Sequence, residues 1–198
     1  MGLFLDAANA WNNLLNTKYY FLLTKKGKQA FEIELSFLPG YFPHLCGMHY
    51  AKDVDFGRNS DEYYGEKLIP ALLNNLIDGS LVEKSQNYKS KIEGRLKAIK
   101  AIENTLDNDF IIAKFNPKLL PVFSKITADY VIKNVATGEE FFVFLDDCPS
   151  GAYCKSAFEF KSVDYLMNQP RLTVLKKVKT VNGQITLNYV HPHYDSSR

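Results

Sequence analysis

The stretch of residues 31–52 limits the fold and the chemistry of this chain more than any other. Its first part alternates between apolar and polar residues, which predicts a half-buried β-strand with four residues on its buried side: Phe31, Ile33, Leu35 and Phe37. Pro39 and Gly40 end that strand, because proline cannot donate a ladder hydrogen bond and glycine accepts turn geometry. The next residues are aromatic and include His44 and His49. A strand that leads through a turn to a histidine beside aromatic rings is a candidate place for chemistry.

The remaining composition describes an ordinary globular chain. Hydrophobic residues make up 46% of the 198 residues, which can fill a sizeable core, and the formal net charge is only +2. No global basic field therefore indicates nucleic acid, and any basic surface must be local. Aromatic residues reach 14%, an excess that suits core packing or base stacking alike.

The cysteines and the hydropathy pattern indicate a cytoplasmic protein. The three cysteines have no paired spacing, so free thiols in a reducing compartment fit better than a disulfide framework. We expect no membrane segment, because no apolar run approaches the roughly 18 residues that a spanning helix needs. We also expect no secretion signal, because no basic region precedes the first apolar residues.

Periodicity predicts an α+β fold. Helical spacing predicts helices at residues 3–15, 71–78 and 90–106, and Asn59 with Glu62 forms a capping-box pattern. Strands are predicted at residues 19–23, 31–37, 110–115, 126–133, 141–145, 155–160, 172–181 and 184–190, the last two joined by Asn182-Gly183. Residues 146–153 read as a loop. We therefore predict N-terminal helices packed on an antiparallel β-sheet of about four to six strands.

Several segments in a fixed order resemble one family. Residues 31–37 lead to Phe42-Pro43-His44-Leu45-Cys46-Gly47, which has the form Phe-x-His-Leu-x-Gly. Residues 91–96, 127–133, 142–145 and 153–158 continue the likeness, which spans residues 31–179. On these segments the chain resembles a phage-associated nuclease family of the Barnase–EndoU–Colicin–RelE fold group.

The resemblance implies a ribonuclease-like or RelE-like domain of phages or mobile elements that acts on RNA in the cytoplasm of a bacterial host, without metal or cofactor. The whole chain, residues 1–198, would form one domain, with a nuclease-like core (18–181), an N-terminal helix (3–16) and a C-terminal hairpin and tail (172–198). Carried over by position, the resemblance marks His44 and Ser156 as site residues, with Lys133 and Arg95 as further matches.

Metal-free RNA cleavage needs a base for the 2′-hydroxyl proton and a cation for the charge that develops on phosphorus. Histidine suits proton transfer because its unperturbed pKa is about 6.5. We therefore predict that His44, Lys133 and Ser156 form the catalytic set. The predicted substrate-binding residues are two further cations, either of which could assist catalysis, together with the matched arginine and two tyrosines for base stacking: Lys52, Lys176, Arg95, Tyr130 and Tyr153.

Each assignment has a structural alternative. His44 could cap a helix or satisfy a buried carbonyl, Lys133 could form an ion pair with Asp129, and the tyrosines could belong to the core. A zinc site is disfavoured, because five-residue spacing would put His44 and His49 on different faces of a helix. The alternative function is a non-catalytic phage inhibitor that binds a host protein or an RNA–protein defence complex, such as an RNA-guided nuclease, or that trims its guide RNA. Nothing in the sequence sets the oligomeric state.

Overall fold

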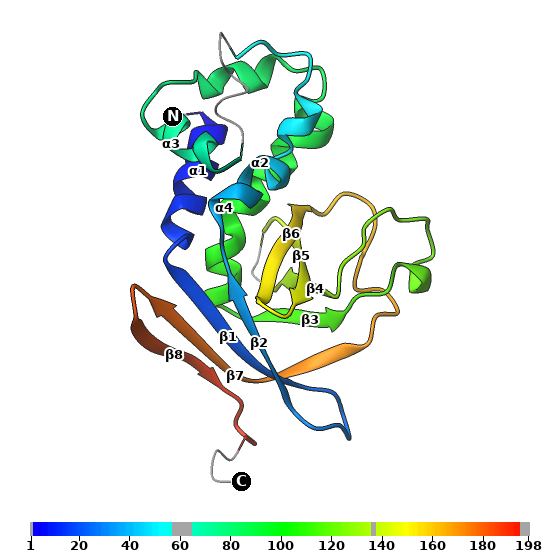
Figure 1. The fold of residues 1–198 in the computed structure, drawn as a ribbon. Coiled ribbons are helices and arrows are strands. Elements are labelled where there is room, and N and C mark those ends of the chain that lie inside the picture. The colour runs from blue at the N-terminus through cyan, green and yellow to red at the C-terminus, as the bar shows by residue number, and fades with distance from the viewer. Residues whose placement is uncertain (1, 57–64, 136–137, 195–198) are drawn as a thin grey trace.

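The computed structural model describes residues 2–56, 65–135 and 138–194. Figure 1 shows the helices gathered at one end of the molecule and the strands at the other, with α1 and α4 running down toward the strands. The helices are α1 (Leu3–Leu14), α2 (Phe42–Leu45), α3 (Leu68–Leu73) and α4 (Glu93–Asp107). Short 3-10 turns are η1 (Pro39–Tyr41), η2 (Met48–Tyr50), η4 (Gly65–Lys67), η5 (Gly79–Lys84) and η7 (Pro117–Leu119), and η6 (Tyr88–Ile92) is a π-helical turn.

The strands form one mixed sheet that closes into a barrel. They are β1 (Thr17–Thr24), β2 (Phe31–Ser36), β3 (Phe110–Lys114), β4 (Tyr130–Asn134), β5 (Phe141–Cys148), β6 (Gly151–Glu159), β7 (Arg171–Val181) and β8 (Gln184–Val190). Their order is β1-β2-β6-β5-β4-β3-β7-β8, and a further pairing of β1 with β7 closes the barrel and leaves β8 outside it. The prediction of an α+β chain is confirmed.

The prediction of an entirely antiparallel sheet with fewer strands is wrong. β2 and β6 run parallel, with Leu35 opposite Ala152 and Ser36 opposite Tyr153. A parallel pair needs a long crossover, and here residues 37–150, which include every helix after α1, separate the two strands. Local periodicity does not record such a distant pairing, so the sequence could not reveal it.

The larger hydrophobic core joins the helices to the strands. It contains side chains from α1, α3 and α4 and from β1 through β7. Trp11 is fully buried in it, donates from Nε1 to the Leu38 carbonyl oxygen (3.1 Å) and meets the Phe37 ring edge-on, with centroids 5.4 Å apart. Trp11 therefore docks α1 onto the core, and truncating such a side chain to alanine typically costs about 3–5 kcal/mol.

A second buried cluster lies on the other face of β3–β6. It includes Val131, Phe142 and Phe144 from the strands and Leu120 and Leu166 from the connecting loops. β5 contributes alternately to both clusters, with Val143 and Leu145 in the larger one. Its two buried faces explain the continuous apolar run of residues 141–145, as expected of a strand covered on both sides.

Several predicted boundaries need correction. Residues 146–153 are not a loop, because β5 and β6 continue to a turn at Pro149 and Ser150. The strand predicted from residue 126 begins only at Tyr130. The helix predicted after Pro70 begins before it, at Leu68, and ends at Leu73. The predicted capping box at Asn59 and Glu62, and the last four residues of the predicted tail, lie outside the described residues.

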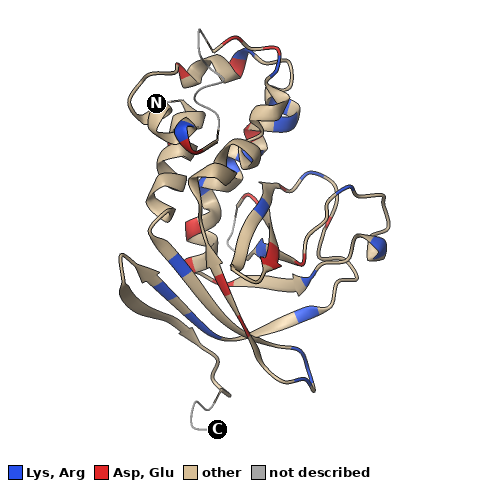
Figure 2. Cartoon of the chain, viewed as in Figure 1, with Lys and Arg blue, Asp and Glu red and all other residues tan. Residues whose placement is uncertain are grey.

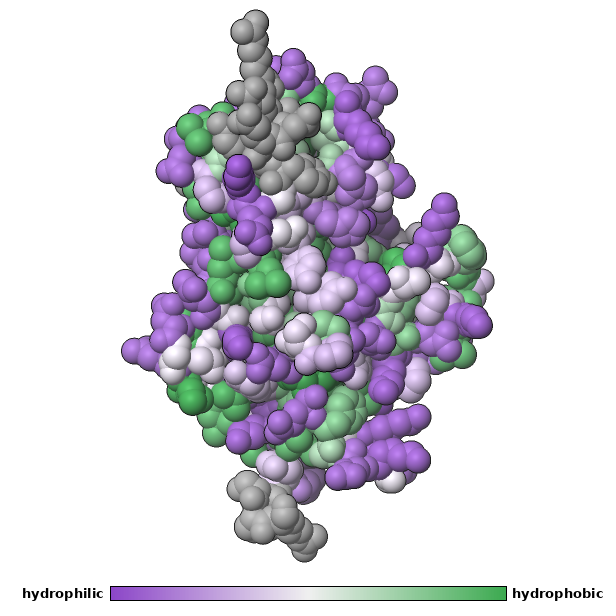
Figure 3. Space-filling model, in the orientation of Figure 1, coloured by the Kyte–Doolittle hydropathy of each residue, from purple (hydrophilic) through white to green (hydrophobic). Residues whose placement is uncertain are grey.

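The exposed surface carries both signs of charge. Figure 2 shows basic and acidic residues interspersed over helices and strands, in keeping with the net charge of +2. On the face drawn in Figure 3, hydrophobic residues come to the surface as separate groups between hydrophilic ones. None of the described helices combines the length and the apolar character that crossing a bilayer would require.

Candidate functional site

The Phe-x-His-Leu-x-Gly segment builds the centre of the candidate site. Phe42 and Leu45 of α2 are fully buried, and the Phe42 ring stacks on Phe4 of α1 with centroids 6.0 Å apart. Residues three apart lie on one side of a helix, so these two anchors fix the short helix on the core. His44 lies between them and is exposed. The same spacing that buries the two apolar residues thus presents the imidazole to solvent.

Gly47 turns the chain back toward His44. Its φ of +83° lies in the left-handed region, which glycine adopts without steric cost. A Cβ atom there would lie 3.1 Å from Cδ of Arg95 and 3.3 Å from Cδ2 of Tyr50. The turn brings the His49 ring onto the His44 ring, with centroids 4.9 Å apart and planes 13° apart. Gly47 therefore permits both the turn and the close passage of Arg95.

Arg95 approaches from the first turn of α4. Its Nη1 donates to Oγ of Ser156 on β6 over 3.2 Å. The guanidinium carbon lies 5.6 Å from the centre of the Tyr50 ring and 5.7 Å from that of Phe158, within the range of cation–π attraction. The π-helical turn Tyr88–Ile92 directly precedes α4, and such turns frequently occur at functional sites. Arg95 therefore joins the helical layer to the barrel.

A β-bulge directs Ser156 toward Arg95. In the β5–β6 pair Leu145 lies opposite Cys154 but Phe144 lies opposite Ser156, so Lys155 is an extra residue. Without it, the period of two would place Ser156 on the same face as Cys154, inside the larger core. With it, Ser156 shares the opposite face with Phe144 and Phe158. The bulge therefore decides which side of the sheet carries the hydroxyl.

Burial and two neighbouring cations lower the pKa of the His44 imidazole, which favours its neutral form. Partial burial lowers the pKa of His44 below its ordinary 6.5, and the charges of Arg95 and Lys155 lower it further. The pKa of His49 is also lowered, first by burial and then by His44, Arg95 and Lys52. The Nδ1 atom of His49 is buried and has no hydrogen-bond partner among the described residues. At neutral pH His44 can therefore accept a proton, and two cations lie near enough to affect its titration.

Lys155 and Tyr153 extend the site along β6. The Lys155 Nζ lies 2.5 Å from Oδ2 of Asp146, and the Tyr153 hydroxyl donates to the same carboxylate oxygen over 3.2 Å. The Tyr153 ring stacks on Tyr41 with centroids 4.6 Å apart and planes 5° apart. Asp146 thus holds Lys155 in place, and an aromatic pair lies beside it.

One comparison with known proteins identifies the family. A family model described as phage-Barnase-EndoU-ColicinE5/D-RelE like nuclease4 matches residues 3–189. The chain belongs to this nuclease family. No curated protein and no solved structure matches the chain. The match begins with α1 and ends in β8, so the nuclease family model takes in the helices and the barrel.

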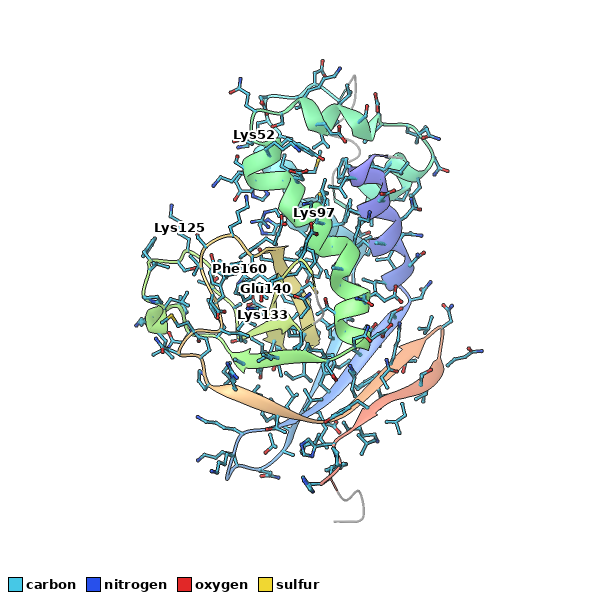
Figure 4. The ribbon with its side chains drawn as sticks, turned by 180° about the vertical axis from the view of Figure 1, so that it is seen from behind. Lys52, Lys97, Lys125, Lys133, Glu140 and Phe160 are labelled. Atoms are coloured by element: carbon cyan, nitrogen blue, oxygen red, sulfur yellow. The ribbon has the colours of Figure 1, made fainter. Side chains whose placement is uncertain are left out.

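In this family member the structure does not bring Lys133 to His44. Lys133 lies on β4, 3.0 Å from Oε2 of Glu140, and its ammonium lies 5.5 Å from the ring centres of Phe142 and Phe160. Figure 4 shows Lys133, Glu140 and Phe160 together, apart from Lys52 near the start of α4. Its side chain is only 16% exposed. Lys133 does form an ion pair, as the structural alternative expected, but its partner is Glu140 and not Asp129. Asp129 precedes the strand and accepts from the Asp147 backbone N–H.

The other predicted binding residues divide into two groups. Arg95 and the exposed Lys52 lie near the two histidines, and Tyr153 stacks on Tyr41, three residues before His44. Tyr130 instead belongs to the larger core, where its ring stacks on Phe31, and burial raises its pKa to about 12. Lys176 is exposed on β7 between Leu22 of β1 and Val190 of β8, on the barrel wall away from α2.

Sequence reasoning missed His49 and Lys155. The spacing argument against a zinc site at His44 and His49 assumes one continuous helix, whereas the chain reverses at Gly47 and stacks the two rings. Glycine between the two histidines was the available signal. Lys155 is the extra residue of the β5–β6 bulge, and the periodicity of the strand did not predict that bulge. Among the described residues, no three His, Cys, Asp or Glu side chains are grouped as metal ligands would be.

Proposed function

We propose that this member of the nuclease family is an endoribonuclease that cleaves RNA by transesterification, with no metal ion taking part. The observation that carries the proposal is the position of His44, whose pKa is lowered by burial and by the nearby charges of Arg95 and Lys155, with Arg95 hydrogen-bonded to Ser156. These groups can supply the proton acceptor and the positive charge that the reaction needs. Its substrate would be RNA, and its setting the bacterial cytoplasm during phage or mobile-element activity.

The reaction can be written with each proton accounted for. His44 takes the proton of the ribose 2′-hydroxyl, and the 2′-oxygen then attacks the adjacent phosphorus. The bond from phosphorus to the 5′-oxygen breaks, and that oxygen takes a proton from a water molecule. The hydroxide that is left takes the proton from His44, so the water and the neutral imidazole are both restored. The products are a 2′,3′-cyclic phosphate and a free 5′-hydroxyl. Arg95 and Lys155 stabilise the additional negative charge on the phosphoryl oxygens, as preorganised cations do.

Ser156 and His49 have supporting roles in this proposal. The Ser156 hydroxyl accepts from Nη1 of Arg95 and so orients the guanidinium. His49 stacks on His44, and a proton on either ring disfavours a proton on the other. The pKa values of both histidines lie below the ordinary one, which favours the neutral form of His44 that can act as the base.

The test is cleavage of total RNA by the purified protein in the presence of EDTA. Fragments ending in cyclic phosphates are expected, and His44→Ala should lower the rate by at least about 100-fold, the usual contribution of a general base. His193→Ala, which changes an exposed histidine in the C-terminal segment, is the matched control and should leave the rate unchanged. Intact RNA, or equal loss in both variants, would remove the proposal.

A second function is favoured by one observation. The net charge is only +2 and the charges are interspersed, whereas proteins that hold free nucleic acid usually make several phosphate contacts. A phage inhibitor that docks on a host protein or an RNA–protein defence complex would need fewer such contacts. Intact RNA together with a stable complex containing one host protein would support this inhibitor, and His44→Ala should then leave the complex intact.

A further inference from the structure

A cleft of about 280 Å³ opens beside Arg95. One wall comes from the turn η2, the π-helical turn η6 and the start of α4, and the other from the end of β6 and the loop that follows it. The lining residues that matter here are three aromatic and three basic side chains: Tyr50, Phe158, Tyr165, Lys91, Arg95 and Lys161. Neither His44 nor Ser156 lines the cleft, so it adjoins the candidate catalytic group through Arg95 rather than containing it.

The walls of the cleft are held by specific contacts. The Lys161 Nζ donates to the Ser90 carbonyl oxygen over 3.0 Å and so ties the loop after β6 to the π-helical turn. Tyr165 meets the Phe158 ring edge-on, with centroids 5.4 Å apart. Gly94 lies at the base, where a Cβ atom would come within 3.3 Å of the Glu159 side chain. A glycine here lets α4 approach β6, and the cleft is a built feature of the fold.

The chemistry of the lining suits a nucleotide. Aromatic faces and guanidinium planes stack on unpaired bases, and cations hold phosphate. Three cations stand against one carboxylate, Glu159, which also pairs with Lys97 over 3.6 Å. The volume lies just below the usual range for ligand pockets, about 300–1,000 Å³, and suits one nucleotide rather than a larger ligand. A base paired within a duplex could not enter, because its faces and its pairing edge are already covered.

We propose that this cleft binds one unpaired nucleotide of the RNA, next to the phosphate that is cleaved. Arg95 holds that phosphate, Phe158 and Tyr165 contact the base, and Lys91 and Lys161 lie at the adjoining phosphate. The inference rests on the proposed ribonuclease function and adds the substrate class, which is single-stranded RNA. Tyr50 connects the cleft to the two histidines. It lines the cleft, and the centre of its ring lies 4.0 Å from that of His49.

The first test measures binding without catalysis. Each of the four nucleoside 3′-monophosphates is added to the wild-type protein, and amide shifts at Gly94 and Val163 are followed by NMR. At least one nucleotide should bind and shift both amides. Val163→Phe, which fills the cleft, should weaken binding about tenfold, within the range for losing one stacked base. Val181→Phe, on β7 away from the cleft, is the matched control and should bind as the wild type does.

Lys91→Glu provides a second variant, because Lys91 is exposed and its replacement does not disturb the core. It too should weaken binding of the nucleotide. The binding site is refuted if no nucleotide shifts the two amides, or if Val163→Phe and Lys91→Glu both bind as tightly as the wild type.

The second test compares cleavage of one RNA sequence as a single strand and as a full duplex. The single strand should be cut at least about tenfold faster, and Val163→Phe should reduce that rate mainly through KM. Equal cleavage of strand and duplex refutes the substrate class. If cleavage depends on His44 but Val163→Phe does not change it, the cleft is refuted as the nucleotide-binding site and the proposed ribonuclease function stands. Nucleotide binding with uncut RNA refutes the proposed function and leaves the binding site in place.

Discussion

Replacing Arg95 by glutamine separates its two effects on the candidate site. The substitution keeps a polar side chain of similar reach but removes the positive charge of the guanidinium, whose Nη1 donates to Oγ of Ser156 over 3.2 Å. It also removes one of the charges that lower the pKa of His44. We therefore expect slower cleavage and, separately, a rise in the pKa of His44 toward its ordinary value of about 6.5.

The size of the rate effect follows from the charge that is lost. Removing one preorganised donor from a site of developing negative charge typically lowers kcat about 10²–10³-fold, or about 2.7–4 kcal/mol. The change in the histidine contributes little at pH 7.5, because an imidazole with a pKa of about 6.5 is about 90% neutral there. The loss measured at pH 7.5 therefore reports charge stabilisation rather than loss of the base.

Two measurements are needed. The rate of cleavage of a single-stranded RNA is measured from pH 5 to pH 8, and the His44 pKa is read from the pH dependence of its ring proton signals by NMR. The control is Lys100→Gln, which removes one positive charge from the same helix but from a side chain paired with Asp6 over 3.1 Å. It should leave both the rate and the titration of His44 unchanged.

The reasoning is refuted by either of two results. A loss of less than about fivefold at pH 7.5 would mean that Arg95 does not stabilise the reaction. A large loss with an unchanged His44 pKa would mean that the guanidinium and the imidazole do not share one site. Thermal unfolding should accompany both assays, so that a rate loss caused by unfolding is recognised.

Three further outcomes are expected. Gly47→Ala forces a residue with a side chain to φ +83° and places its Cβ 3.1 Å from Cδ of Arg95. Chemical denaturation should show that the fold is destabilised by about 1–2 kcal/mol. Activity should fall by more than this loss of folding free energy explains. In the wild type, the acid limb of the rate profile should have its midpoint below pH 6.5, because only neutral His44 is a base and its pKa is lowered; a midpoint above 6.5 would contradict the assignment. Lys133→Gln should leave activity within about twofold and cost about 0–1 kcal/mol of unfolding free energy, since Lys133 pairs with the half-exposed Glu140; a large rate loss would return Lys133 to the site.

Some elements could be predicted because their signals are local. The turn at Asn182-Gly183 has φ values of +49° and +83° and joins β7 to β8 as the dipeptide predicts. The alternation in residues 31–36 reappears as β2, and the apolar stripe of α4 faces the core. The position of His44 in the site likewise follows from a short motif whose neighbours, Phe42 and Leu45, are anchored by burial.

Other elements could not be predicted because they depend on distant partners. Barrel closure joins β1 to β7, and the parallel pair joins β2 to β6, across more than a hundred residues. The choice between Lys133 and Arg95 as the cation beside His44 is of this kind. Both are basic residues in regular elements, and only the docking of α4 against β6 brings Arg95 to Ser156.

The order of residues alone determined that the chain is α+β, where most of its helices and strands lie, and that His44 is a candidate for chemistry. These properties depend on periods of two and 3.6 residues and on turn-forming residues, which act over a few positions. The tertiary structure decided which cation lies beside that histidine and which hydroxyl orients the cation. The docking of α4 against β6 settles the first matter and the bulge at Lys155 settles the second. Both depend on neighbours that lie far apart in the sequence.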